Sequence, residues 1–351
     1  MGDWRKNIRK VVPYTPGEQP KRTNLIKLNT NENPYPPSKK VQEMMEKVDG
    51  WRLYPDPAAS KLVHALAKYH NLEDDQVFVG VGSDDVLAMA FMTFFNSEKP
   101  IFFPDITYSF YDVWADLFRI PYETKALDDD FNIVKEDYMK PNGGIIFPNP
   151  NAPTGVLVEL GFIEDIIKAN QDVIVIIDEA YIDFGGVSAK ELLNKYKNLL
   201  VVQTYSKSRS LAGLRIGYAM GNKELIKALN DVKYSFNSYT MNQPAIAIGA
   251  AVLEDEEHFQ ETTSKIIATR EWFKEEMKAF GFSFADSKSN FLFVTHENAA
   301  AKDIFEAAKA KDIFVRYFNK PRINNYLRIT IGTRAEMENF LQFIKEFLNQ
   351  L

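Results

Sequence analysis

Five β-branched residues in succession, Val173–Ile177, run directly into an acidic residue, Asp178. Such a run is typical of a strand that is buried on both faces, as in a parallel sheet covered by helices. A carboxylate at the end of a buried strand needs a partner, because an unpaired buried charge costs several kcal/mol. A structural salt bridge is the usual partner, and a functional group at a site is the alternative.

Other short apolar runs also end in glycine or in polar residues, and segments with helical spacing separate them. The predicted strands end near Gly82, Thr107, Asn151, Asp178 and Lys207. Strands that alternate with helices are typical of an α/β fold with a doubly wound, mostly parallel sheet. In such folds the functional site lies beyond the carboxyl edge of the strands.

The chain has 351 residues, more than one ordinary domain. Residues 1–35 are rich in proline, asparagine, lysine and arginine, which is compatible with a disordered tail or with an ordered arm. We expect an N-terminal arm over 1–35, a large domain over 36–245 and a smaller C-terminal α/β domain over 246–351. The helical, charged pattern after about residue 221 predicts packing helices and then a long helix that leads out of the large domain.

Composition excludes several classes of protein. Hydrophobic residues make up 45% and charged residues 26% of the chain, as in soluble globular proteins. No apolar run approaches the length of a membrane span. The polar start is not a signal peptide, and Lys6 stands where a myristoylation motif needs serine or threonine. We therefore expect a cytoplasmic protein.

Metal and nucleic-acid binding are not expected either. The chain has no cysteine, so disulfides, thiol nucleophiles and cysteine-bound metals are excluded. The four histidines show no paired metal-ligand spacing; they are His64, His70, His258 and His296. The net charge of −6 argues against a basic surface for nucleic acid.

Lys207 follows the apolar run Leu199–Val202 and would lie at the carboxyl edge of the sheet. A single lysine is most often a solvated surface charge. Here Ser206 and Arg215 flank it with a hydroxyl and a fixed cation, a pair suited to a phosphate dianion. Lys207 is therefore a candidate functional residue.

The segment Ser206-Lys207-x-x-x-Leu-Ala-Gly-Leu-Arg215-x-Gly-Tyr218 resembles that of class I/II pyridoxal-phosphate aminotransferases, specifically the histidinol-phosphate aminotransferase family. The resemblance extends from Tyr14 to Arg328, with motifs in matching order. It implies the fold type I architecture and pyridoxal 5′-phosphate as cofactor. The matching lysine bonds covalently to the cofactor, and the matching serine and arginine hold its phosphate.

The resemblance also assigns a role to Asp178 and its neighbour. Asp178 would keep the ring nitrogen of the cofactor protonated, so that the ring accepts electrons. Tyr181 would donate to the phenolic oxygen of the cofactor. With Lys207, these two residues are the expected catalytic group.

Gly82-Ser83-Asp84 lies between a predicted strand and a helix. Ser83 or Asp84 can cap that helix, whose first amides form an anion site that glycine lets a phosphate approach. A plain turn is an equally good interpretation of this stretch alone. A dinucleotide fingerprint fails because Asp85 stands where glycine is required, and no P-loop sequence is present.

Three further cofactor contacts are implied by the resemblance. The tyrosine that matches Tyr108 stacks on the cofactor ring. The asparagine before Pro-Thr-Gly, which binds the phenolic oxygen in many members, is here Ala152, so we expect Asn151 to substitute. The Ala152–Pro153 bond can be cis. The tyrosine that matches Tyr54 reaches the phosphate in the neighbouring subunit, which implies a homodimer.

On the substrate side, the resemblance points to Tyr14, Glu32, Arg316 and Arg328. Glu32 belongs to the Asn-Glu-Asn-Pro signature, and Arg328 matches an arginine that binds carboxylates through a bidentate fork. Arg316 matches a second anion contact. Histidinol phosphate and 2-oxoglutarate are both anions, so two arginines suit one pocket that accepts each in turn.

The implied activity is ping-pong transamination between L-histidinol phosphate and 2-oxoglutarate, in histidine biosynthesis. An aromatic-amino-acid aminotransferase or a threonine-phosphate decarboxylase on the same scaffold is the alternative enzyme. A cofactor-free binding or regulatory protein is the alternative from another class, and the presence of both Lys207 and Asp178 argues against it.

Overall fold

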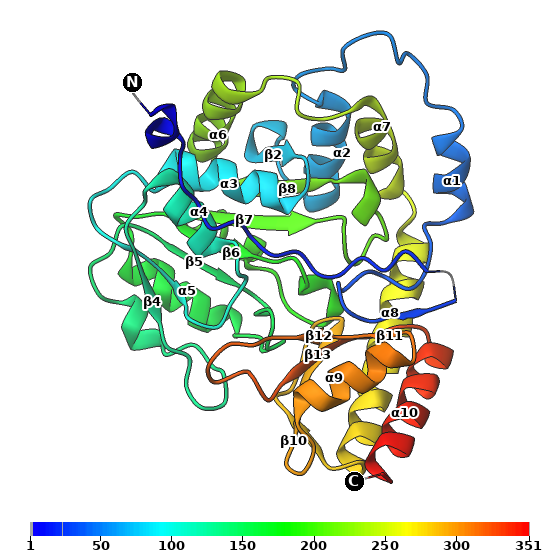
Figure 1. Ribbon diagram of the computed structural model, residues 1–351. Coiled ribbons are helices and arrows are strands. Elements are labelled where there is room, and N and C mark those ends of the chain that lie inside the picture. Colours follow the sequence, from blue (N-terminus) through cyan, green and yellow to red (C-terminus); the bar gives the residue numbers. More distant parts are fainter. Residues whose placement is uncertain (1–2, 23, 351) are drawn as a thin grey trace.

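The computed structural model describes residues 3–22 and 24–350 (Figure 1). The prediction about the polar start includes Met1 and Gly2, which lie outside the described residues. Within the described part of the chain, no helix is both long and apolar enough to cross a membrane.

A seven-stranded sheet forms the centre of the larger part of the molecule (Figure 1). Its strands, in spatial order, are β2 (Val77–Gly80), β8 (Gly217–Gly221), β7 (Leu199–Thr204), β6 (Val175–Asp178), β5 (Ile145–Pro148), β3 (Ile101–Pro104) and β4 (Tyr122–Lys125). Strand β8 is antiparallel to both of its neighbours, and the other pairs are parallel. The predicted mostly parallel sheet is confirmed.

Helices cover both faces of this sheet, because successive strand residues point to opposite sides. In β6, Val175 and Ile177 belong to one apolar core and Ile176 belongs to another. The first core contains side chains of α2 (Ser60–His70), α5 (Leu160–Ala169) and α7 (Gln243–Val252). The second contains side chains of α3 (Ser83–Phe94), α4 (Tyr111–Phe118) and α6 (Lys223–Phe236). The doubly wound arrangement is therefore confirmed.

The β-branched run enters the sheet later than its composition predicts. Strand β6 begins at Val175, whereas the run begins at Val173. The backbone N–H of Val173 donates to the carbonyl of Asn170 at 3.3 Å, in the turn that follows α5. The turn takes up the start of the run, and β6 contains the last three residues of the run together with Asp178.

A smaller antiparallel sheet lies in the C-terminal part of the chain (Figure 1). Its strands, in spatial order, are β12 (Arg316–Tyr317), β13 (Leu327–Thr330), β10 (Phe291–His296) and β9 (Phe282–Phe284). The long helix α8 (Glu256–Ala279), α9 (Ala301–Ala310) and α10 (Arg334–Leu348) pack with it around a third core. The predicted helical region and the alternation that follows it are both present.

The N-terminal segment is joined to this C-terminal part. Strand β1 (Ile26–Lys27) pairs in parallel with β11 (Ile313–Phe314), and Leu28 is buried in the third core. Helix α1 (Lys39–Met45) follows. Short 3₁₀ helices occupy Trp4–Asn7, Asp74–Gln76, Lys135–Tyr138, Ile182–Phe184, Ala189–Leu192 and Ala212–Leu214.

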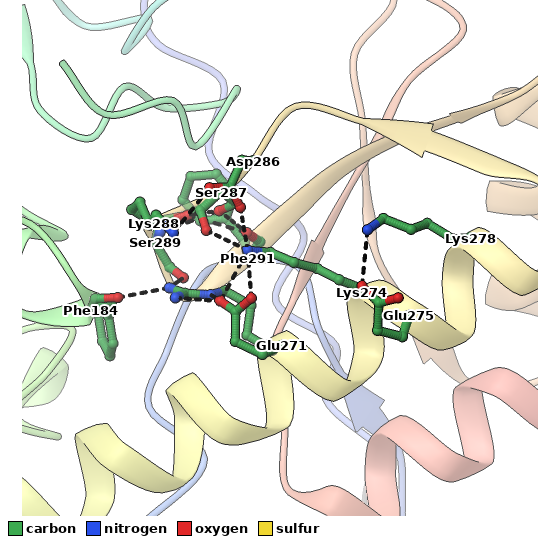
Figure 2. A network of polar contacts seen from close by, with 11 residues as sticks. Phe184, Glu271, Lys274, Glu275, Lys278, Asp286, Ser287, Lys288, Ser289 and Phe291 are labelled. Atoms are coloured by element: carbon green, nitrogen blue, oxygen red, sulfur yellow. Dashed lines mark hydrogen bonds and ion pairs between the residues drawn. The ribbon is translucent and has the colours of Figure 1, made fainter.

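Two buried cations on α8 contact the residues that lead into β10, and one of them, Arg270, also contacts the 3₁₀ turn at Ile182–Phe184. The guanidinium of Arg270, 2% exposed, donates through Nη1 to the carbonyls of Phe184 and Ser289, each at 2.8 Å. Lys274 donates to Asp286 at 2.6 Å and to the carbonyl of Ser287 at 3.0 Å, as Figure 2 shows. The contacts of Arg270 hold the 3₁₀ turn at Ile182–Phe184 against the residues that lead into β10.

Candidate active site

A cavity of about 110 Å³ opens at the carboxyl edge of the large sheet. Predicted site residues from separate strand ends meet around it, together with Pro148, Ala152, Ala180 and Thr204. The predicted residues in its lining are Ser83, Asp84, Tyr108, Asp178, Tyr181, Ser206, Lys207 and Arg215. The edge of the sheet therefore gathers these side chains in one place, as the strand ends predict.

Lys207 lies just beyond the end of β7 and points toward the N-terminal segment. Its Nζ donates to the carbonyl of Thr30 at 3.1 Å and lies 5.7 Å from the centre of the Tyr181 ring. No carboxylate forms an ion pair with Lys207 among the ion pairs of the described residues. The amine is therefore held by a neutral acceptor.

Asp178 ends β6 and is 4% exposed. The Tyr111 hydroxyl donates to its Oδ2 at 2.8 Å, and the Ala180 backbone N–H donates to its Oδ1 at 3.3 Å. Burial raises the pKa of Asp178 to about 6, although these two hydrogen bonds act in the opposite direction. A cationic group in the cavity would stabilise the carboxylate form.

The opposite end of the cavity is suited to an anion. Arg215 donates through Nη1 to the Ser206 hydroxyl at 3.3 Å and through Nη2 to Asp84 at 3.1 Å. The Tyr108 hydroxyl also donates to Asp84, at 2.7 Å. The first amides of α3 lie at this end, where a helix N-terminus favours negative charge.

Gly82 makes this arrangement possible. It is the N-cap of α3 with a φ of 84° and a ψ of 165°, a region that only glycine adopts readily. A Cβ at this position would lie 2.5 Å from Arg215 Nη2. The prediction that Ser83 or Asp84 caps the helix is wrong, because Gly82 is the cap and forms no side-chain hydrogen bond.

Asn151 does not line the cavity, contrary to its predicted role. Its Nδ2 donates to the carbonyl of Ile106 at 2.9 Å and to Thr154 Oγ1 at 3.0 Å. Its Oδ1 accepts from the Thr107 hydroxyl at 3.0 Å. Both amide hydrogens are thus donated within the loops, so Asn151 has none left for a ligand, and Ala152 faces the cavity instead. The Asn149–Pro150 and Ala152–Pro153 bonds are both cis.

A second cavity, of about 470 Å³, shares this part of the molecule and contains Tyr14 and Arg316 in its lining. The Tyr14 ring stacks on Phe110 with ring centres 4.1 Å apart. Arg316 and Arg328 are directly opposite each other in the β12–β13 pair. Arg328 donates through Nη2 to the carbonyl of Asn29 at 3.0 Å, and its buried Nε has no partner among the described residues.

The structure does not place Arg328, Glu32 or Tyr54 in either cavity lining. Glu32 accepts from Lys27 Nζ at 2.6 Å and from the Thr30 hydroxyl. Burial raises the pKa of Glu32, but these hydrogen bonds outweigh burial and leave the pKa below its ordinary value. Tyr54 is 82% exposed, with its ring 4.7 Å from that of Tyr239.

Sequence reasoning missed three residues that contact the predicted ones: Tyr111, Thr30 and Asn31. Burial keeps the pKa of Tyr111 well above its usual range, so its hydroxyl retains the hydrogen that it donates to Asp178. Asn31 donates to the Tyr181 hydroxyl at 2.9 Å. Thr30 and Asn31 belong to the same motif as Glu32, which was the only signal for them.

The fold and the lysine-centred cavity define an aminotransferase of class I and II. The family model described as "Aminotransferase class I and II" matches residues 23–344, so the chain belongs to this family. Histidinol-phosphate aminotransferase of Lactococcus lactis subsp. cremoris (strain MG1363) is 54% identical over 347 residues, covering 98% of each chain.

Solved structures agree on the fold. The histidinol-phosphate aminotransferase from Clostridium acetobutylicum aligns with a TM-score of 0.86 at 23% identity, covering 93% of this chain and 100% of the other. The corresponding enzyme from Sinorhizobium meliloti, in complex with pyridoxal-5′-phosphate, aligns with a TM-score of 0.83 at 22% identity, covering 92% and 91%.

Pyridoxal 5′-phosphate is the cofactor of this family, and the cavity fits it. Arg215, Ser206 and the glycine at position 82 form a cradle for a phosphate. The buried Asp178 at the other end suits the protonated ring nitrogen. Lys207 lies in the same lining, where it can bond to the cofactor aldehyde. Across residues 3–22 and 24–350, no group of His, Cys, Asp or Glu is arranged to hold a metal ion.

Proposed function

We propose that this chain catalyses the ping-pong transfer of an amino group between L-histidinol phosphate and 2-oxoglutarate, as a histidinol-phosphate aminotransferase in histidine biosynthesis. The observation that carries this proposal is one cavity lined by Lys207, Asp178 and Arg215. The 54% identity to the Lactococcus lactis enzyme supports the substrate.

The bound cofactor supplies an electron sink for the negative charge that develops on the substrate carbon. Lys207 is the proton carrier in this proposal: its Nζ takes the proton from the substrate carbon that bears the amino group and would return it to C4′ of the cofactor, which is two bonds away. Its Nζ is held by the carbonyl of Thr30, a neutral acceptor that leaves the amine free to move. Tyr181 lies beside it and donates to the phenolic oxygen.

Asp178 holds the proton on the ring nitrogen. Its carboxylate accepts from Tyr111 and from the Ala180 backbone, which fixes both oxygens. Since burial alone disfavours the charged carboxylate, a cationic ring nitrogen is its natural partner. Tyr108 packs against the cofactor, and Ser83 and Asp84 contribute the first amides of α3 to its phosphate.

Arg316 and Arg328 bind the anionic ends of the two substrates. The phosphate of L-histidinol phosphate and the distal carboxylate of 2-oxoglutarate enter the same site in alternate half-reactions. Arg316 lines the larger cavity beside Tyr14, and Arg328 retains an unpartnered buried Nε among the described residues. Two guanidinium groups can bind either anion by donating paired hydrogen bonds to its oxygens.

We also propose a cytoplasmic homodimer in which Tyr54 reaches the cofactor phosphate of the partner subunit. Tyr54 is 82% exposed, and Trp51 and Leu53 in the same segment are 69% and 60% exposed. Exposed apolar side chains in one segment favour a protein interface. The proposed division into an arm (1–35), a large domain (36–245) and a small domain (246–351) is supported by the two separate main sheets.

The visible absorption of the cofactor-loaded protein tests this function directly. L-Histidinol phosphate, added without any oxo acid, should convert the visible band to that of the aminated cofactor. Addition of 2-oxoglutarate should then restore the band. The Lys207→Ala variant should bind cofactor and show no turnover.

Two results would change the conclusion. A band that responds to phenylalanine or to threonine phosphate, and not to L-histidinol phosphate, would assign the chain to the alternative enzymes. Wild-type rates in the Lys207→Ala variant would contradict the role of the lysine.

A further inference from the structure

The side chain of Asn31 lies between the active-site cavity and strand β13. Asn31 is 1% exposed. Its Nδ2 donates to the Tyr181 hydroxyl at 2.9 Å, and its Oδ1 accepts from the Thr330 hydroxyl at 3.0 Å. The Thr330 oxygen also accepts from the backbone N–H of Asn31, at 3.0 Å. Asn31 thus connects Thr330 to Tyr181.

In the structure these hydrogen bonds run in one direction, from Thr330 through Asn31 to Tyr181. Thr330 has a single hydroxyl hydrogen, which it donates to Asn31 Oδ1. The amide nitrogen of Asn31 faces Tyr181 and donates to it. Because the Tyr181 oxygen accepts this hydrogen bond, its own hydrogen is free to point elsewhere, and Tyr181 lines the cavity.

The backbone at position 31 supports this arrangement. Asn31 has a φ of 57°, in the left-handed region where asparagine is favoured over other side chains. Its carbonyl accepts from Asn290 Nδ2 at 3.0 Å. The preceding carbonyl, that of Thr30, accepts from Lys207. One turn of the N-terminal segment therefore contacts both Lys207 and Tyr181.

The hydrogen bond from Asn31 to Tyr181 is important because of the residue at position 152, which is alanine. Ala152 lines the cavity at the position where related enzymes carry an asparagine for the phenolic oxygen, and its side chain has no donor. Asn151 cannot replace it, because both hydrogens of its amide are donated within the loops. Tyr181, which lines the same cavity, is the donor that we expect for that oxygen, and the direction of its hydrogen matters more.

We propose that Asn31 is a positioning residue that directs the Tyr181 hydroxyl hydrogen toward the phenolic oxygen of the cofactor and so offsets the missing donor at Ala152. The proposal rests on the proposed role of Tyr181 in holding the cofactor. Asn31 is not among the residues that line the cavity, so it would act through Tyr181.

The test is a pH titration of the visible absorption of the cofactor-loaded protein. A hydrogen bond to the phenolic oxygen stabilises its anionic form and lowers the pH at which the band converts. Asn31→Gly removes the amide and keeps a backbone that accepts the positive φ. We expect its midpoint to rise by about one pH unit, a tenfold change in the proton equilibrium.

Three further variants separate positioning from general destabilisation. In Asn31→Gly/Tyr181→Phe the midpoint should equal that of Tyr181→Phe alone, since Asn31 acts through Tyr181. Ala152→Asn added to Asn31→Gly should lower the midpoint back toward the wild-type value. Asn170→Ala, at a buried asparagine that follows α5, should leave the midpoint unchanged.

Thr330→Val provides a second route if Asn31→Gly does not fold. It keeps the shape of the side chain and removes the hydroxyl that orients the amide, so the midpoint should rise by a smaller amount. An unchanged midpoint in the folded Asn31→Gly or Thr330→Val protein overturns the proposal. Full additivity with Tyr181→Phe also overturns it.

Failure of this inference and failure of the proposed function give different results. A wild-type protein that takes up no cofactor, or whose visible band does not respond to L-histidinol phosphate, would refute the function. A wild-type band that responds normally, with a midpoint that Asn31 does not influence, would refute the inference alone.

Discussion

Arg316 and Arg328 are cross-strand partners in the β12–β13 ladder, so two guanidinium side chains start from directly opposed positions. Like charges directly opposite each other destabilise a sheet. Burial lowers the pKa of Arg328, with the nearby charge of Arg316 acting in the same direction. A bound anion would relieve this repulsion, which is consistent with the proposed role of the pair in binding anionic substrates.

Arg316→Ala should therefore lower the activity of the enzyme without lowering its stability. We expect kcat/KM for L-histidinol phosphate to fall about 10- to 100-fold, because a charge-assisted hydrogen bond contributes about 1.5–3 kcal/mol. The unfolding free energy of the cofactor-free protein should stay constant or rise by up to about 1 kcal/mol, since one of two opposed like charges is removed. Steady-state kinetics and urea unfolding measure the two quantities.

L-Histidinol, which lacks the phosphate, is the matched comparison for this variant. Its kcat/KM should change less than that of the phosphorylated substrate. An equally small effect on both substrates would contradict an anion-binding role for Arg316.

Asp178→Asn should change the pH dependence of stability in the cofactor-free protein. Folding raises the pKa of Asp178 from 3.8 to about 6, so the folded state binds this proton more tightly than the unfolded chain. The contribution of Asp178 to stability is therefore present at low pH and lost as the pH rises from about 4 to about 6. A shift of about two units corresponds to about 3 kcal/mol.

Urea unfolding between pH 4 and pH 8 measures this contribution. The wild-type free energy should decline more steeply than that of Asp178→Asn across the range from about 4 to about 6. Burial also raises the pKa of Glu179, to about 7, but Glu179 is present in both proteins and cancels in the comparison. Asp172→Asn, at an exposed position before the same strand, is the control. Parallel curves for wild type and Asp178→Asn would show that Asp178 titrates as it does in the unfolded chain.

Gly82→Ala should weaken the phosphate end of the site. A side chain at this φ and ψ costs about 1–3 kcal/mol, and its Cβ would displace Arg215. We expect the dissociation constant of pyridoxal 5′-phosphate to rise more than tenfold, as measured by fluorescence titration of the cofactor-free protein.

Gly213→Ala is the matched control for Gly82→Ala. A Cβ at Gly213 meets no atom within 4 Å, and the position lies two residues before Arg215. Its effect on stability should be within about 1 kcal/mol, because only the flexibility of the unfolded chain changes. Equal cofactor affinities in the two variants would mean that Gly82 does not shape the cradle.

The central sheet and most of the cavity lining can be predicted from the sequence for a physical reason. Lys207 and Asp178 each follow an apolar run, and parallel strands bring their carboxyl ends to one edge. The local sequence pattern is then enough to predict that residues from distant parts of the chain lie close together. The start of β6 is less predictable, because the turn after α5 competes for Val173.

Contacts that depend on the direction of a side chain cannot be predicted from the local sequence pattern. Tyr111 and Asp178 are 67 residues apart, and nothing local shows that the hydroxyl meets the carboxylate. Asn151 has the right chemistry for a cofactor contact, but Ile106 and Thr154 accept both of its amide hydrogens. Glu32 likewise pairs with Lys27, a residue outside its motif.

A mixing experiment decides whether Tyr54 acts across subunits. Tyr54→Ala and Lys207→Ala should each have very low activity when measured alone. In a hybrid dimer, one site contains Lys207 from one subunit and Tyr54 from the other, so it is complete. Random exchange of equal amounts should then restore up to about a quarter of the wild-type activity, since half of the dimers are hybrids with one intact site each.

The control for this experiment mixes Lys207→Ala with Asp178→Ala. Both residues line the same cavity of one chain, so neither site of that hybrid is complete and no activity should return. Tyr54 lies outside that lining and is largely exposed. It should therefore complete the site of the other subunit, whereas Lys207 and Asp178 serve the site of their own subunit. If the Tyr54→Ala mixture shows only the sum of the two separate activities, Tyr54 either acts within its own chain or has no role in the site.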